Sequence, residues 1–151
     1  MPRAAAANEV PDVAQDVLDQ LVGYALRRAQ LLVYEDFAAT LGASMTPQRF
    51  AALVLVGANP GLSQTALGEL LQIARSGSMV LVDWLEAEGL IERRPRPEDR
   101  RAYGLHLTAR GVESLEAWKR AALEHDMRVT ATLSDAERAE LHRLLRKIAD
   151  R

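Results

Sequence analysis

Residues 85–111 read LEAEGLIERRPRPEDRRAYGLHLTARG, and this stretch decides the predicted fold. Its first residues end an apolar, helix-forming segment, and Gly89 follows where a left-handed residue commonly terminates a helix. Two short segments of strand-forming composition, 90–94 and 102–107, then flank a turn at 95–101 that carries proline and charge. The stretch therefore predicts the end of a helix followed by an antiparallel β-hairpin.

The predicted hairpin is locally basic in a chain that is acidic overall. Residues 90–111 contain six arginines and three acids, a local charge of +3, whereas the whole chain has a net charge of −2. This segregation concentrates positive potential on one segment. Charge alone more often indicates a solvated hairpin, so a role in nucleic-acid binding depends on the neighbouring elements.

Three helices are predicted between residue 46 and the hairpin. Thr46 is placed to cap the first, with Pro47 at its first position, and the sequence Asn-Pro-Gly at 59–61 ends it. Ser63 is placed to cap the second and Ser76 the third, which runs to residue 88. The inward face of the second is expected to consist of Leu67, Leu70, Leu71 and Ile73.

Long helices are predicted on both sides of this unit. One extends from residue 12 to about residue 41, and another begins after Thr108 and ends near residue 129. Ser134 and Glu137 form a capping-box pattern that opens a last helix ending near residue 148. The apolar stripes of these helices exceed what a unit of about 80 residues can cover, which predicts a homodimer. An intrachain bundle is the alternative.

The predicted order of elements is that of a winged helix-turn-helix protein, in which one helix enters the DNA major groove and a hairpin contacts the flanking backbone and minor groove. Residues 85–93, 97–102 and 105–111 resemble the signature of the multiple-antibiotic-resistance regulator (MarR) family. The resemblance implies a mainly α fold with a small β-hairpin. The winged unit would occupy 46–108, with dimerisation helices at 12–45 and 109–151 and a disordered tail at 1–11.

The resemblance also implies a DNA-binding role for particular side chains. In the family, an aspartate two residues before a wing arginine holds that arginine for insertion into the minor groove, which corresponds here to Asp99 and Arg101. The residues expected to contact DNA are Ser63, Gln64, Arg75, Ser76, Met79, Val80, Arg94, Arg96, Asp99, Arg100 and Arg101.

The helix before the hairpin has an unusual composition for a reading helix. Turning Ser78, Leu81, Val82 and Leu85 inward leaves an outward face of Ser76, Met79, Val80 and Asp83. Family members commonly carry arginine or another polar group where Val80 and Trp84 stand. We therefore expect weak direct base readout, with specificity drawn from the wing and from DNA shape. The alternative is a protein-interaction or ligand-sensing module with reduced DNA binding.

The resemblance further implies a repressor that leaves a palindromic operator when a small, aromatic or phenolic molecule binds. The segment GYALRRAQ at 23–30, followed by Tyr34, is similar to members that respond to aromatic acids or their coenzyme A thioesters. Tyr24, Arg27, Arg28 and Tyr34 are therefore the candidate effector-binding residues. Arginines can hold a carboxylate or phosphate, although solvated helix arginines are the alternative.

Other classes of function receive little support from the sequence. The chain has no cysteine, its three histidines are not at metal-ligand spacing, and no glycine-rich phosphate loop or nucleophile motif occurs. We expect no enzyme activity, cofactor or metal. A signal peptide and a membrane-spanning stretch are also missing from the sequence, so we expect a cytoplasmic protein whose partners are double-stranded DNA, a second copy and a small molecule.

Overall fold

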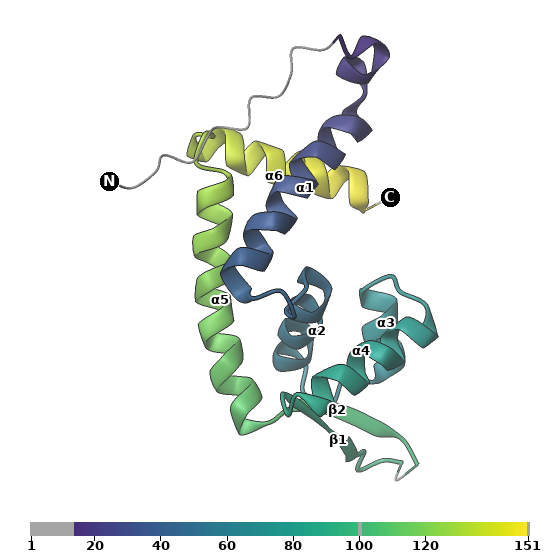
Figure 1. Ribbon diagram of the computed structural model, residues 1–151. Helices are drawn as coiled ribbons and strands as arrows, with labels where there is room; N and C mark the ends of the chain where they lie inside the picture. The colour runs from purple at the N-terminus through teal and green to yellow at the C-terminus, as the bar shows by residue number, and fades with distance from the viewer. Residues whose placement is uncertain (1–13, 100, 151) are drawn as a thin grey trace, which may run out of the picture.

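The computed structural model describes residues 14–99 and 101–150, and it contains six α-helices and one hairpin within them. The elements are η1 (Asp16–Gln20, a 3-10 helix), α1 (Val22–Leu41), α2 (Pro47–Ala58), α3 (Gln64–Leu70), α4 (Arg75–Ala87), β1 (Ile91–Pro95), β2 (Tyr103–Leu107), α5 (Ala109–Val129) and α6 (Asp135–Ala149). Helices α2 to α4 and the hairpin form one end of the molecule, and α5 runs from this end to the other, where α6 follows it (Figure 1). The mainly α class with one small hairpin is confirmed. The tail expected at 1–11 lies outside the described residues.

Side-chain caps fix the starts of four helices where the sequence predicts them. The hydroxyl oxygens of Thr46, Ser63 and Thr108 each accept a hydrogen bond from a backbone N–H three residues later, at 2.9–3.2 Å. Ser134 and Glu137 form the complete capping box at the start of α6. Each such cap stabilises its helix by about 1 kcal/mol.

The prediction of one continuous helix over residues 12–41 is wrong. The chain forms the short 3-10 helix η1, passes through an extended backbone at Leu21, and enters α1 at Val22. Val17 and Leu18 of η1 are exposed, as are Leu21 and Val22. Because these apolar side chains are exposed, their helical spacing alone does not hold a regular α-helix.

Two predictions around the turn between α3 and α4 are also wrong. Ser76 does not cap α4, because the turn, in which Gln72 has a φ of 53°, already brings Arg75 into the helix with Ala74 at the N-cap. Leu70 was expected to face inward but is 57% exposed. Helix α3 has only seven residues, and its buried apolar side chain is Leu67.

The core lies at the winged end, where α2, α3, α4 and the hairpin meet the first half of α5. The expected inward face of α4 is confirmed, since Ser78, Leu81, Val82 and Leu85 are all buried. α1 packs along α5 and joins this core through its last turns, where Phe37 and Leu41 are buried. The largest fully buried apolar side chains are Leu53, Leu67, Leu85, Ile91, Leu105, Val56 and Val82.

The hairpin is attached to the turn between α2 and α3. Its strands pair from Ile91 with Leu107 to Pro95 with Tyr103, within one residue of the predicted bounds. Leu105 also exchanges backbone hydrogen bonds with this turn, donating to the Leu62 carbonyl at 2.8 Å and accepting from the Gly61 N–H at 2.9 Å. A Cβ atom on Gly104 would lie 2.8 Å from the Gly61 backbone, so the close approach requires glycine. The wing is thereby fixed to the helix-turn-helix unit.

Two further observations concern the described part of the chain. None of its helices is both long enough and apolar enough to cross a membrane. Its His, Asp and Glu side chains also do not gather into a group of three that could hold a metal ion.

Candidate nucleic-acid interface

The outward face of α4 has the apolar character that the sequence indicates. Met79 and Val80 are 51% and 65% exposed, and Ser76 and Asp83 lie on the same exposed side. Arg75 is the helix's single basic residue, and it is exposed at the first helical position. This face can contact thymine methyl groups but offers few donors for bidentate hydrogen bonds to bases.

Arg93, in β1, connects the wing to α4 and α3. Its Nη2 atom donates to the Asp83 carboxylate at 2.6 Å and to the Gln64 side-chain oxygen at 3.3 Å, and its Nη1 atom donates to Glu86. Asp83 and Glu86 are three residues apart on α4 and therefore present both carboxylates to one guanidinium. Sequence reasoning missed this contact; the signal was the acidic pair preceding a basic strand.

The wing arginines have different partners. Arg94 is ion-paired with Glu92 on its own strand, and Arg96 donates to the Gly61 carbonyl at 2.8 Å. The Asp99 carboxylate accepts from the backbone N–H of Arg101 at 2.9 Å, so it shapes the wing tip at this residue. Within the described residues the exposed Arg101 guanidinium has no ion-pair partner. Arg100 lies outside the described residues.

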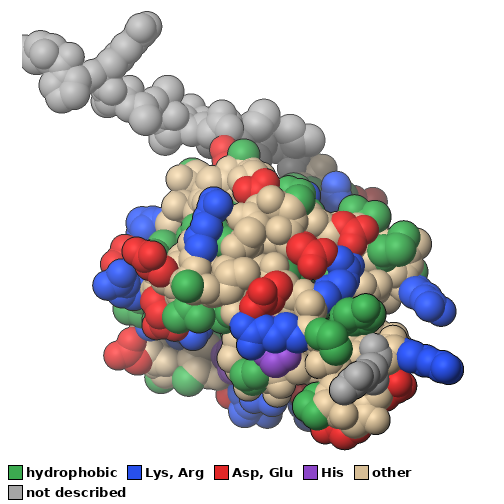
Figure 2. All heavy atoms as spheres, turned by 90° about the horizontal axis from the view of Figure 1, so that it is seen from below, with side chains coloured by type: hydrophobic (Ala, Val, Ile, Leu, Met, Phe, Trp, Pro, Cys, Tyr) green, Lys and Arg blue, Asp and Glu red, His purple; other side chains and the backbone are tan. Residues whose placement is uncertain are grey.

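The remaining predicted DNA contacts lie on the same end of the molecule. Ser63 accepts the capping hydrogen bond of α3, and the neighbouring Gln64 is the residue that Arg93 contacts. Seen from below the winged end, basic and acidic side chains alternate, with apolar side chains between them (Figure 2). The basic charge is therefore distributed over several small groups on this face.

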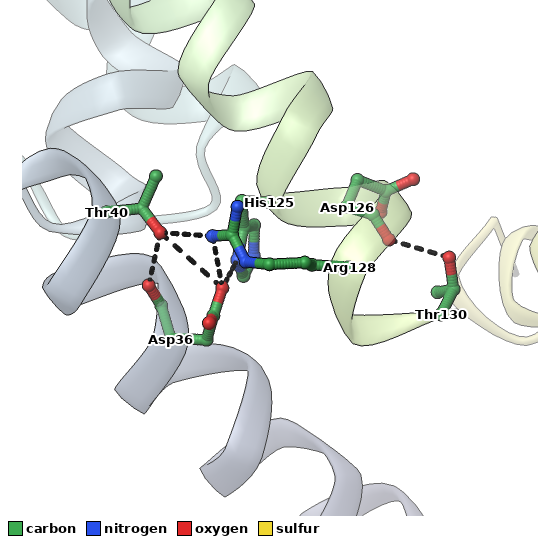
Figure 3. Close-up of polar contacts among 6 residues, drawn as sticks. All are labelled: Asp36, Thr40, His125, Asp126, Arg128 and Thr130. Carbon is green, nitrogen blue, oxygen red and sulfur yellow. Dashed lines mark hydrogen bonds and ion pairs between the residues drawn. The ribbon is translucent and has the colours of Figure 1, made fainter. Parts of the chain in front are cut away.

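A second polar cluster joins α1 to α5. The Nδ1 atom of His125, which is buried, lies 2.6 Å from the Asp36 carboxylate, and Arg128 donates to Asp36 at 2.9 Å and to Thr40 at 2.6 Å (Figure 3). Because an ionised carboxylate can only accept, Nδ1 carries the proton in this contact. The Arg128 hydrogen bond, followed by that of His125, lowers the pKa of Asp36 below its ordinary value of 3.8. Phe37 packs edge-on against the His125 ring.

The four candidate effector residues lie along α1. Tyr24 is half-buried, whereas Arg27, Arg28 and Tyr34 are exposed. Arg28 lines an open hollow of about 470 Å³ whose other walls are the apolar side chains of Ala25, Ala29, Leu31 and Leu32. Within one chain these residues therefore lie on an open helix surface.

Comparison with known proteins identifies the family. The family model described as the MarR family matches residues 43–102. A protein assigned to regulation of the hcr operon in Thauera aromatica is 40% identical over 129 residues, which cover 84% of this chain and 78% of that protein. The chain belongs to the MarR family. This confirms the family predicted from residues 85–111.

Solved structures of a family member resemble this MarR-family regulator over most of its length. The transcriptional repressor CouR bound to a 23-mer DNA duplex matches with a TM-score of 0.85 and 38% identity, over 91% of this chain and 99% of CouR. CouR bound to p-coumaroyl-CoA matches with a TM-score of 0.82 and 36% identity, over 91% of this chain and 98% of CouR. The chain is thus a transcriptional regulator of the MarR type with the winged helix-turn-helix fold.

Proposed function

We propose that this regulator is a homodimeric repressor that leaves a palindromic operator when an aromatic acid or its coenzyme A thioester binds. One observation carries the proposal. CouR has been solved bound to DNA and bound to p-coumaroyl-CoA, and each structure matches 91% of this chain. A chain with this fold can therefore bind DNA in one state and a coenzyme A thioester in the other.

Uncovered apolar surface supports the homodimer. α6 contains no buried residue, although one side of it is apolar. An isolated helix of 15 residues is marginally stable in water, and apolar faces of this extent mark interaction surfaces. A second copy would cover them. The exposed apolar residues at this end include Leu26, Leu31, Leu32, Leu123, Met127, Leu141, Leu144, Leu145 and Ile148.

The dimer in turn defines the operator. A two-fold axis presents two α4 helices and two wings, which fit a palindrome with half-sites about 10 bp apart. Arg101 is the wing cation best placed for the minor groove, because Asp99 shapes the backbone beside it and its side chain is exposed. Minor grooves that are narrow attract such arginines.

Charge supports an acidic effector. Arg27 and Arg28 are adjacent and exposed on α1, beside the half-buried Tyr24. Guanidinium groups bind carboxylates and phosphates, and tyrosine supplies a ring and a hydroxyl for an aromatic ligand. In the dimer, the second copy and the winged end would enclose this surface. A coupling of about 1–3 kcal/mol between effector and DNA corresponds to a 5- to 150-fold change in affinity.

The proposal is tested with the purified chain and the intergenic DNA beside its own gene. Fluorescence anisotropy over a salt series should show a specific complex that p-coumaroyl-CoA or a free aromatic acid weakens, whereas coenzyme A alone leaves it unchanged. Light scattering should give twice the chain mass of 16.6 kDa. Absence of a specific complex at low salt would contradict the proposal and favour a protein-binding role for the apolar face of α4.

The wing is tested with Arg101→Ala. This variant should weaken DNA binding and reduce the slope of log affinity against log salt by about one phosphate contact per protomer, or more if a groove contact is also lost. Arg120→Ala, which removes an exposed arginine from α5, is the matched control. Equal affinity of the two variants would exclude Arg101 from DNA binding.

A further inference from the structure

An arginine from α2 lies against the flank of α4 that faces away from the wing. The guanidinium carbon of Arg49 lies 3.8 Å from the centroid of the Trp84 ring, and its Nη1 atom donates to the Ser44 carbonyl at 2.5 Å. Successive helix residues are about 100° apart, so Trp84 is on the opposite flank from Glu86, which Arg93 contacts. The reading helix is thus held between two arginines, one on each side.

These two arginines differ in their charge partners. Arg93 is ion-paired with Asp83 and Glu86, so its charge is compensated. Arg49 has no carboxylate within ion-pair distance among residues 14–99 and 101–150. The indole ring restricts the position of the guanidinium, and the edge N–H groups that do not donate to Ser44 remain available as donors. Arg49 is therefore a positioned cation without an anion.

The surface beside Arg49 is hollowed and carries hydrogen-bond donors that an anion could accept from. A hollow of about 460 Å³ opens between the beginnings of α2 and α4. Besides Arg49, its polar walls are Thr46, Gln48 and Ser76, which carry hydroxyl and amide donors, and its floor includes Gly77 and Val80. Ser76 and Val80 also belong to the outward face of α4, so the hollow adjoins the surface expected to meet DNA.

We propose that Arg49, held on the ring of Trp84, binds a backbone phosphate of duplex DNA at the flank of α4 opposite the wing. Gln48 and Ser76 add neutral donors to the same phosphate. Helix α4 carries a single basic residue, Arg75, so a second phosphate beside α4 draws its cation from another element. Trp84 acts as a positioning residue, because it touches the arginine and not the DNA.

The inference rests on DNA binding by this face, and its test separates the two claims. Arg49→Gln keeps a polar side chain of similar reach without the charge. Loss of one charge-assisted contact should weaken binding about tenfold per protomer. The slope against log salt should fall by about one phosphate contact per protomer. Because a phosphate contact does not read sequence, operator and unrelated duplex DNA should be affected alike.

Trp84 is tested through Arg49. Trp84→Leu should lose part of the affinity, Trp84→Phe should retain most of it, and neither should add to the loss caused by Arg49→Gln. Circular dichroism and the unfolding midpoint show whether each variant is folded, and Arg120→Ala is the matched loss of an exposed arginine. An additive Trp84→Leu effect would show that the ring does not act through Arg49.

Four outcomes decide the proposal. Weaker binding with a reduced salt slope on both duplexes supports it. Unchanged binding by Arg49→Gln, with the wild type still bound to its operator, overturns this inference alone, and a loss confined to the operator shows that Arg49 reads bases. If the wild type binds no duplex even at low salt, the proposed repressor function and this subsite are both overturned.

Discussion

Replacing Arg93 by methionine tests how the wing is held against α4. Methionine keeps an apolar stem of similar length but removes the guanidinium, and with it the contacts to Asp83, Glu86 and Gln64. The Arg93 side chain is 28% exposed and the two carboxylates are more exposed, so we assign both contacts the energy of surface ion pairs. Each contributes about 0.5–1 kcal/mol at such exposure.

The variant also leaves two carboxylates three residues apart on α4. Like charges at this spacing destabilise a helix by about 0.2–0.5 kcal/mol. The free energy of unfolding should therefore fall by about 1.2–2.5 kcal/mol, which at about 3 °C per kcal/mol for a chain of this size lowers the midpoint of thermal unfolding by about 4–8 °C. The loss should shrink at high salt, since the lost interactions are screened there.

Arg94→Met is the matched control, because Arg94 is the next residue of the same strand and its one ion-pair partner among residues 14–99 and 101–150 is Glu92, at an exposed site. It should lower the free energy of unfolding by about 0.5 kcal/mol or less. Both variants are compared by thermal and urea unfolding at one protein concentration, at low and high salt. If Arg93→Met is no less stable than Arg94→Met, Arg93 does not hold the wing to α4.

Two further changes affect stability at other points of the fold. The pKa of Asp36 is lowered in the folded state, so the ionised carboxylate stabilises the protein above its ordinary pKa, and this stabilisation is lost as the pH falls through the lowered pKa. The free energy of unfolding in urea should therefore decline less steeply between pH 5 and pH 3 in Asp36→Asn than in the wild type. Asp19→Asn is the control and should leave the decline unchanged. A Cβ atom on Gly111 would overlap the Leu90 carbonyl oxygen, so Gly111→Ala should lower the free energy of unfolding by about 2–3 kcal/mol. Gly23→Ala, which meets open space in α1, should be neutral or slightly stabilising, and equal midpoints for the two alanine variants would contradict the close approach.

The local features of this fold could be predicted from the sequence. Caps at Thr46, Ser63, Thr108 and Ser134 depend on hydrogen bonds that span three residues, so the sequence around each residue contains the whole interaction. The buried face of α4 follows from helical periodicity in the same way. The prediction of a continuous helix from residue 12 was wrong because the apolar residues before α1 have helical spacing but exposed side chains. Packing does not support the periodicity there.

The contacts that organise the site could not be predicted, because their partners are far apart in the chain. Arg93 reaches Gln64 across 29 residues, and His125 reaches Asp36 across 89. Composition identified Arg93 only as one of several basic wing residues, and Trp84 only as a departure from the family. Their contacts depend on how α2, α4 and the hairpin pack, which no short stretch of sequence determines.

The attachment of the wing to the turn between α2 and α3 determines how the winged end can move. Backbone hydrogen bonds from Leu105 and the Arg96 contact to Gly61 make the hairpin and this turn a single stiff body. α5 joins that body to the far end through 21 residues, a lever of about 30 Å. A tilt of about 5° at one end of such a lever displaces the other by about 2.6 Å, from the helical rise. In the proposed homodimer, motion started at α1 would therefore change the separation of the two winged ends while each winged end keeps its internal shape.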